Sequence, residues 1–261
     1  MLDIIRKGVL RKGIVTSDYP QEGTPRYAAR LGFPKLRTDL CKAHHVCFRS
    51  CPTNAIQERE GEIKVDLGLC IFCAQCARSC PEGAWTMSPE IELAKRSRSD
   101  LLSSSSIENK SIQELGKSLD AMIGKVFGRS LAIREVDTGS CNACEVEVNA
   151  LSNAVHDIER FGMHIVASPR HADLLLVTGP VTRNMERALM QTYKATPEPK
   201  LVVAVGACAC SGGIFRESYA VRGGVDRMLP VDVYIPGCPP RPEAMIYGLM
   251  LAVGKLNDKS R

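Results

Sequence analysis

Cysteine is the chemically informative residue of this 261-residue chain, which has 12 of them. Four in the C-terminal half lie just past three predicted strands: Cys141, Cys144, Cys208 and Cys238. Ligands of open parallel sheets bind beyond the carboxyl ends of the strands, so these four thiols can converge on one centre. Because thiolates are the usual protein ligands of iron–sulfur clusters, the arrangement predicts a redox cluster at that edge.

A second group of cysteines follows the pattern by which bacterial ferredoxins bind 4Fe-4S clusters. The run C-x2-C-x2-C-x3-C-P is formed by Cys70, Cys73, Cys76 and Cys80. An upstream copy has histidine in place of its second cysteine and consists of Cys41, His44, Cys47 and Cys51. The fourth cysteine of each run binds the other cluster in this pattern. The predicted ligand sets are therefore Cys51, Cys70, Cys73 and Cys76 for one cluster, and Cys41, His44, Cys47 and Cys80 for the other.

The role of His44 has three interpretations. Imidazole can replace thiolate on an iron and raises the reduction potential when it does. This interpretation is favoured because the other three ligands of the set are in place. The alternatives are a three-iron cluster and a site that has lost its cluster. His45 would break the three-residue step as a ligand, and it is expected on the polar surface.

The elements that must position the C-terminal cysteines alternate between short apolar strands and longer helices. Strands are predicted over 131–136, 164–167, 174–178, 201–205 and 231–235. Helices are predicted over 144–160, 184–194 and 241–255. This alternation is typical of an α/β fold whose parallel sheet is covered on both faces.

Composition divides the chain into three parts. Residues 1–92 are expected to form a small α+β module with an N-terminal extension, and residues 93–128 a polar, Ser-rich linker with a connecting helix. Residues 129–261 are expected to form the α/β domain. The small module has few apolar residues for a core, namely Ile56, Val65, Leu67, Phe72 and Trp85. Its clusters must therefore contribute to its stability.

Bulk properties exclude several classes of protein. Disulfide-dense folds are typically small and secreted, and no apolar signal peptide is recognisable here, so metal-binding thiolates are favoured over disulfides. No run of residues is apolar and long enough to span a bilayer. The formal net charge is +5; the basic runs lack interleaved aromatic residues, so nucleic acid is not an expected partner. These basic runs could bind an acidic partner or anionic lipid, or form a solvated surface.

Four segments resemble one family: SCNACEVEVNAL, GPVTRNM, GACACSGGIF and VDVYIPGCPPRPEAMIYGL. Together they are similar to the small subunit of membrane-bound, energy-converting NiFe hydrogenases of the formate hydrogenlyase type, which is related to the 20 kDa (B) subunit of complex I. The first 90 residues look like the separate two-cluster ferredoxin-like subunit of these complexes, so the chain looks like a fusion of the two. His44 departs from that subunit's pattern.

The resemblance implies a flavodoxin-like domain whose 4Fe-4S cluster, on the four C-terminal cysteines, passes electrons to a NiFe centre in a partner large subunit. With the two N-terminal sites it implies three clusters. The expected donor is a formate dehydrogenase or a ferredoxin, and membrane subunits would couple the reaction to ion pumping. The chain would be an electron-transfer subunit of an oxidoreductase, peripheral on the cytoplasmic side of the inner membrane. The alternative is a relay to quinone in a complex I-like or nickel-free hydrogenase-related complex.

Two further residues near the C-terminal cysteines receive expectations. The resemblance implies a proton-relay role for Glu145; the simpler explanation is that a helix N-terminus favours an acidic residue. Cys210 lies outside the ligand register of Cys208, so it is expected to be a buried free thiol, although the two cysteines could exchange roles. A free carrier or redox sensor without a catalytic partner is disfavoured, because the segments GGIF and IPGCPP suit a buried interface.

Overall fold

The C-terminal domain is built on a five-stranded parallel sheet. In this computed structural model, which describes residues 15–20, 32–59, 61–103 and 129–259, the strands are β6 (Leu131–Asp137), β7 (Met163–Ile165), β8 (Leu174–Thr178), β9 (Leu201–Val205) and β10 (Val233–Ile235). Their order is β7-β6-β8-β9-β10, and every neighbouring pair is parallel. This is the flavodoxin-like order, so the predicted fold class is confirmed.

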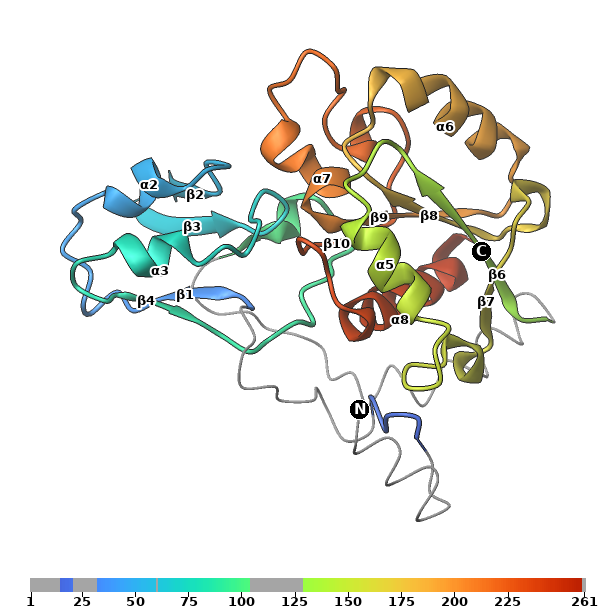
Figure 1. Cartoon of the computed structure of the whole chain (residues 1–261), viewed down its shortest axis with the longest axis horizontal. Helices are drawn as coiled ribbons and strands as arrows, with labels where there is room; N and C mark the ends of the chain where they lie inside the picture. Colours follow the sequence, from blue (N-terminus) through green and yellow to red (C-terminus); the bar gives the residue numbers. More distant parts are fainter. Residues whose placement is uncertain (1–14, 21–31, 60, 104–128, 260–261) are drawn as a thin grey trace.

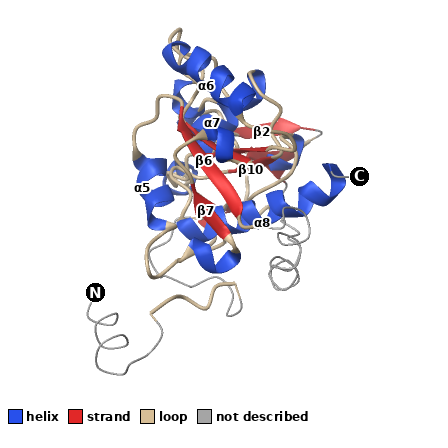
Figure 2. Cartoon of the chain, turned by 90° about the vertical axis from the view of Figure 1, so that its right-hand side faces the viewer, coloured by secondary structure: helices blue, strands red, loops and turns tan. Residues whose placement is uncertain are grey.

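Helices cover both faces of the sheet, as Figures 1 and 2 show. Side chains of α5 (Ala143–Ala150) and α8 (Pro242–Lys259) pack with one face, which presents alternate residues such as Ile133 and Leu176. Side chains of α6 (Arg183–Ala195) and α7 (Gly206–Ser211) pack with the other face. Because both faces are covered, β8 and β9 are buried along their whole length. That burial explains why these strands are continuous apolar runs.

Some element bounds differ from the sequence prediction. The helix predicted over 144–160 ends at Ala150, and a turn leads to the 3-10 helix η3 (Ile158–Phe161). The side chain of Asn153 accepts hydrogen bonds from the amides of Val155 and His156, which stabilises this turn instead of further helix. The strands predicted over 164–167 and 231–235 are shorter than expected, and α7 was not predicted. No helix in the described ranges is long and apolar enough to cross a membrane.

The N-terminal module is small and pseudosymmetric. It contains α2 (Val46–Ser50) and α3 (Gln75–Ser79), the antiparallel pair β1 (Pro34–Leu36) and β4 (Trp85–Met87), and the strands β2 (Ile56–Arg59) and β3 (Glu62–Asp66). The hydroxyls of Ser50 and Ser79 meet at 2.8 Å where the two helices pack. Of the predicted core residues, Ile56, Val65, Leu67 and Trp85 are buried and Phe72 is partly buried. The same apolar cluster continues into the C-terminal domain through Tyr234 and Leu175.

The first part of the predicted linker is built into both halves of the molecule. Residues 102–103 form β5 (Leu102–Ser103), which pairs with β3, and Lys95 forms an antiparallel bridge with Tyr234 of β10. Between them lies the 3-10 helix η2 (Ser99–Leu101). The predicted connecting helix lies outside the described residues. The linker prediction therefore overlooked ordered structure over residues 95–103.

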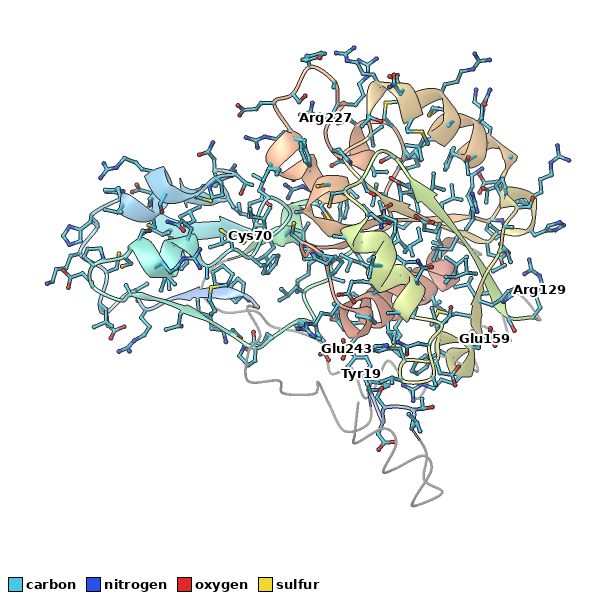
Figure 3. All side chains as sticks on the ribbon, in the orientation of Figure 1. Tyr19, Cys70, Arg129, Glu159, Arg227 and Glu243 are labelled. Atoms are coloured by element: carbon cyan, nitrogen blue, oxygen red, sulfur yellow. The ribbon has the colours of Figure 1, made fainter. Side chains whose placement is uncertain are left out.

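The described part of the N-terminal extension, residues 15–20, docks on the C-terminal domain. Tyr19 is 2% exposed within the core formed by α8 and the sheet. Its hydroxyl donates to Glu92 at 3.2 Å, and Arg160 donates to the carbonyls of Ser17 and Tyr19. Figure 3 shows Tyr19 beside Glu243 of α8. The chain therefore contacts the C-terminal domain both before and after the cysteine-rich module.

Candidate iron–sulfur cluster sites

The four C-terminal cysteines lie at the carboxyl edge of the parallel sheet. Cys141 follows β6, Cys144 is in the first turn of α5, Cys208 is in α7 after β9, and Cys238 follows β10. Burial, and then the neighbouring thiols of Cys238 and Cys141, raises the pKa of Cys208 to about 12. Burial likewise raises the pKa of Cys144, with contributions from the other three thiols. The structure thus brings together the four residues that the sequence predicted to converge.

Glycines make room for the sulfur atoms at this site. A Cβ added to Gly206, whose φ is +87°, would lie 2.8 Å from the Sγ of Cys144. A Cβ on Gly213 would lie 3.1 Å from the Sγ of Cys208. Side chains at either position would crowd the thiols from the protein side. The site therefore fits ligands whose sulfur atoms point into a common space.

Two cavities in the N-terminal module are lined by the crossed cysteine sets. One is lined by Cys51, Cys70, Cys73 and Cys76. The other is lined by Cys41, His44, Cys47 and Cys80. Each cavity therefore receives three residues from one run and the fourth cysteine from the other, as the ferredoxin pattern predicts.

Amide and indole groups point at several of these sulfur atoms. The amide of Ala55 donates to the Sγ of Cys51 at 3.3 Å, and the amide of Phe72 donates to the Sγ of Cys70 at 3.4 Å. The pKa of Cys70 is raised to about 12, because burial outweighs the lowering effect of the hydrogen bond from Phe72. Burial also raises the pKa of Cys47, against a hydrogen bond from Trp85. Such donors stabilise thiolates that bind metal.

The backbone around His44 has the same conformation as the backbone around Cys73. Residues before and after Cys73, Phe72 and Ala74, have φ values of 55° and 58°. The corresponding neighbours of His44, Ala43 and His45, have φ values of 53° and 52°. Non-glycine residues rarely adopt this region, which costs on the order of 1–3 kcal/mol each. His44 is therefore presented by a strained loop of the kind that presents Cys73.

Glu82 holds the imidazole of His44. Nε2 of His44 lies 3.2 Å from Oε1 of Glu82, whose other oxygen is 3.0 Å from Nζ of Lys42. Bonds from Lys42 and His44 lower the pKa of Glu82. His45 is exposed, and its ring lies tilted against that of Phe48 with ring centroids 5.3 Å apart. It also lines the cavity of Cys41 and Cys47, so its exclusion from the ligand set stays a prediction. A carboxylate on one ring nitrogen is the usual way in which a metal-binding histidine is oriented.

The donor sets suit multi-iron clusters better than single ions. Within the described ranges, no three His, Cys, Asp or Glu side chains come close enough to bind one metal ion. In a cube-shaped cluster each cysteine binds a different iron, so its four ligands lie farther apart than those of a single ion. Metal binding also removes the protons of buried thiols, whose pKa is raised in these cavities.

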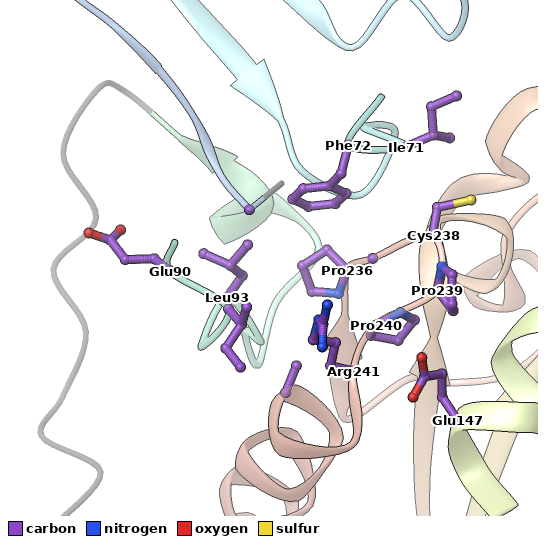
Figure 4. A pocket seen from close by; sticks show the side chains of 14 residues that line it. Ile71, Phe72, Glu90, Leu93, Glu147, Pro236, Cys238, Pro239, Pro240 and Arg241 are labelled. Carbon is purple, nitrogen blue, oxygen red and sulfur yellow. The ribbon is translucent and has the colours of Figure 1, made fainter. Parts of the chain in front are cut away.

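The two halves of the molecule meet at a pocket beside Cys238 (Figure 4). Ile71 and Phe72 line it from the N-terminal module, and Cys238, Arg241 and Glu147 line it from the C-terminal domain. Burial raises the pKa of Cys238, and the thiols of Cys141 and Cys73 raise it further. The cavity containing Cys73 is thus the nearer of the two N-terminal cavities to the C-terminal site. Sequence reasoning missed this junction, although Phe72 lies between two ligand cysteines.

Glu145 and Cys210 have different surroundings. Both carboxylate oxygens of Glu145 are buried and lack a hydrogen-bond partner among the described residues. Its charge raises the pKa of Glu135, after the larger effect of burial. Cys210 is fully buried, as expected, and its Sγ lies 3.8 Å from the carbonyl oxygen of Ala204.

Two family models match the chain. The family described as the NADH ubiquinone oxidoreductase 20 kDa subunit matches residues 141–252, and the 4Fe-4S binding domain matches residues 63–86. The second match covers the run from Cys70 to Cys80 and leaves out the run that contains His44.

Several curated proteins are similar to about half of this chain. Formate hydrogenlyase subunit 7 of Escherichia coli is 47% identical over 148 residues, which are 57% of this chain and 58% of that protein. The probable membrane-bound hydrogenase subunit mbhJ of Pyrococcus furiosus is 49% identical over 52% of this chain and 81% of its own length. An NADH-quinone oxidoreductase subunit of Geobacter sp. is 49% identical over 54% of this chain and 79% of its own length. The chain therefore covers little more than half of the length of formate hydrogenlyase subunit 7.

Proposed function

Because this chain belongs to the family of the 20 kDa subunit of NADH:ubiquinone oxidoreductase, we propose that it relays electrons through iron–sulfur clusters to a NiFe catalytic subunit in a membrane-bound hydrogenase complex. The observation that carries this proposal is the convergence of four cysteines at the carboxyl edge of the sheet, next to a module with two further cysteine-lined cavities. Clusters supply one-electron chemistry; the chain holds them and sets their surroundings.

Three clusters are proposed, one for each cysteine set. The C-terminal set would hold the cluster that faces the catalytic subunit, and the set with Cys73 would hold its neighbour. The third would be held by Cys41, His44, Cys47 and Cys80. The matched backbone of His44 and Cys73 supports His44 as the fourth ligand, with Glu82 as the residue that orients its ring.

An exposed apolar surface around the C-terminal site supports a large protein partner. Ile214 and Phe215, which follow Cys208, are 55% and 41% exposed, and Val146, which follows Cys144, is 59% exposed. Large apolar side chains that gather at one place on a surface mark interaction sites. We place a NiFe hydrogenase-type large subunit on this surface, where it would cover the cluster.

The remaining assignments are proposed from the resemblance of the four C-terminal segments to energy-converting hydrogenases. A formate dehydrogenase module or a ferredoxin would reduce the N-terminal clusters, and membrane subunits would couple hydrogen formation to ion translocation. The chain would then lie on the cytoplasmic side of the inner membrane as a peripheral subunit. Glu145 is proposed as a proton-relay residue beside the C-terminal cluster, because its buried carboxylate lacks a partner within the described structure.

A relay to quinone is the second candidate. The NADH-quinone oxidoreductase relative from Geobacter sp. is as similar to this chain as the hydrogenase relative from Pyrococcus furiosus, at 49% identity for each. In a complex I-like or nickel-free hydrogenase-related assembly, the same clusters would deliver electrons to quinone.

Anaerobic purification of the native complex through a tag on this chain distinguishes the two candidates. Stoichiometric nickel in the purified complex and hydrogen evolution from a reduced dye are expected. A large subunit without nickel or hydrogenase activity would favour the quinone relay. The variant Ile214→Glu should lose the large subunit during purification, whereas Ile165→Glu, on a strand that carries no proposed ligand, should retain it. Equal retention by both variants would contradict the proposed docking surface.

A further inference from the structure

A charged pair fixes the loop that leads into Cys70. Asp66 ends β3, and its Oδ1 accepts hydrogen bonds from the amides of Gly68 (2.9 Å) and Leu69 (3.3 Å). Arg98, just before η2, binds both oxygens of Asp66 through Nη1 and Nη2 at 2.9 and 2.8 Å. Arg98 also lies over Gly68, where an added Cβ would come within 2.9 Å of its Cζ. The path of the chain into the ligand run is therefore set by this pair.

The same loop is attached to the C-terminal ligand elements. The hydroxyl of Ser211, at the end of α7, lies 2.6 Å from the carbonyl oxygen of Gly68. Cys208 is in the same short helix. The segment that carries Arg98 is tied to β10 by two backbone hydrogen bonds between Lys95 and Tyr234, of 3.0 and 2.8 Å. One compact group of contacts thus joins the elements that bear Cys70, Cys208 and Cys238.

We infer that the Arg98–Asp66 pair, together with Ser211, sets the distance between two of the proposed clusters. These are the cluster bound by the set with Cys70 and Cys73, and the C-terminal cluster. The inference rests on the proposed function, because it requires a cluster in each site. Electron transfer between two centres slows steeply as their separation grows, so a small displacement of this loop changes the rate. Phe72 and Cys238 line one pocket at the junction, which shows that the two ligand runs face each other there.

The charge and burial of the pair explain why it can hold the junction. The side chains of Arg98 and Asp66 are 29% and 11% exposed. A two-pronged arginine–carboxylate contact fixes direction as well as distance. Removing the guanidinium leaves a largely buried carboxylate without its cation, which is strongly unfavourable. The turn that Asp66 stabilises would then rearrange toward water and carry the ligand loop with it.

The chain offers a matched control at the opposite end of the sheet. Arg129 binds both oxygens of Asp173 at 2.8 and 2.7 Å, and Asp173 accepts a hydrogen bond from the amide of Ala132. This pair has the same chemistry as Arg98–Asp66 but precedes β6 and β8, whereas the cysteines follow the strands. Figure 3 shows Arg129 far from Cys70.

The test compares Arg98→Ala, Arg98→Lys and Arg129→Ala in the full-length, cluster-containing protein. Iron content and the visible spectrum first establish that the clusters are retained. Magnetic coupling between the two reduced clusters, measured by electron paramagnetic resonance, should weaken in Arg98→Ala and be partly restored in Arg98→Lys. It should be unchanged in Arg129→Ala. The rate of electron transfer from the N-terminal to the C-terminal cluster after flash reduction should fall several-fold in Arg98→Ala alone.

The measurements distinguish failure of the inference from failure of the proposed function. Unchanged coupling and rate in Arg98→Ala, with clusters intact, would overturn the inference while leaving the relay in place. Absence of inter-cluster coupling and transfer in the unmodified protein would instead overturn the proposed function. Should Arg98→Ala fail to assemble, Ser211→Ala tests the contact from the other side. Its coupling should also weaken, and hydrogen exchange at the amides of Gly68 and Leu69 should accelerate; wild-type values for both would reject the inference.

Discussion

The N-terminal module and the C-terminal domain position cysteines on very different amounts of apolar core. In the C-terminal domain, β8 and β9 are fully buried and helices cover both faces of the sheet. The module has strands of three to five residues and two five-residue helices, and several of its core contacts are made by the cysteines themselves. The domain is therefore expected to form its site without clusters, whereas the module is expected to depend on the clusters proposed for it.

The largest expected effect is on the module. Cys70→Ser removes one of the four ligands proposed for the cluster of Cys51, Cys70, Cys73 and Cys76. Loss of that cluster should unfold the module. Hydrogen exchange of the full-length protein should then become fast throughout residues 32–93 and stay slow in β6, β8 and β9. Cys210→Ala, which removes a buried thiol with no proposed cluster, is the control and should keep the module protected. Slow exchange in a cluster-free module would remove the contrast between the two halves.

A cavity in the core of the sheet should destabilise the C-terminal domain more than the N-terminal module. Leu176 is fully buried in β8, and Leu176→Ala should lower the free energy of unfolding of the C-terminal domain by about 2–5 kcal/mol. The visible spectrum of the N-terminal clusters should persist to higher denaturant concentration than the domain's own cluster. Simultaneous loss of all clusters in a denaturant titration would show that the two halves unfold as one unit.

Substitution of His44 sharpens the comparison within the module. Imidazole ligation raises the potential of a cluster, so His44→Cys should lower the midpoint potential of one cluster and leave the other two unchanged. His44→Ala should reduce the iron content at that site, and His45→Ala should resemble the unmodified protein. Redox titration with iron analysis measures both quantities. Identical spectra and potentials for all three variants would exclude His44 as a ligand.

The smallest effect concerns the alkaline stability of the C-terminal domain. Burial, and then the charge of Glu92, raises the pKa of Tyr247 to about 12. The raised pKa of the folded state means that this contribution to stability is complete below pH 10, the ordinary value, and is lost as pH rises toward about 12. Tyr247→Phe should flatten the fall in unfolding free energy over this range. Tyr219→Phe, at a residue 89% exposed, should leave the slope as it is.

The sequence was sufficient to predict structure where a local pattern of residues is compatible with one kind of element. Continuous apolar runs such as LLLVT and LVVAV predict buried parallel strands, and the cysteine spacing predicts which residues line each N-terminal cavity. The helix predicted to reach residue 160 failed because Asn153 offers its side chain to two amides, a competition that helical periodicity does not register.

Long-range polar contacts could not be predicted. Arg98 lies in a Ser-rich stretch whose composition is typical of a linker, and its partner Asp66 is 32 residues away. Ser211 and Gly68 are separated by 143 residues. Two single residues that pair across the halves of the molecule produce no periodic pattern in the sequence. Composition alone therefore cannot distinguish a buried ion pair from a solvated charge.

The docking of Tyr19 on the C-terminal domain makes the cysteine-rich module an insertion that is attached at both ends. Ser17 and Tyr19 are held by Arg160 before the module, and Lys95 is held by Tyr234 after it. A module that loses its clusters and unfolds would therefore remain a closed loop, whose chain entropy is lower than that of a free end. Its local concentration beside the domain would stay high while iron is replaced, which favours repair in place over exchange of the subunit.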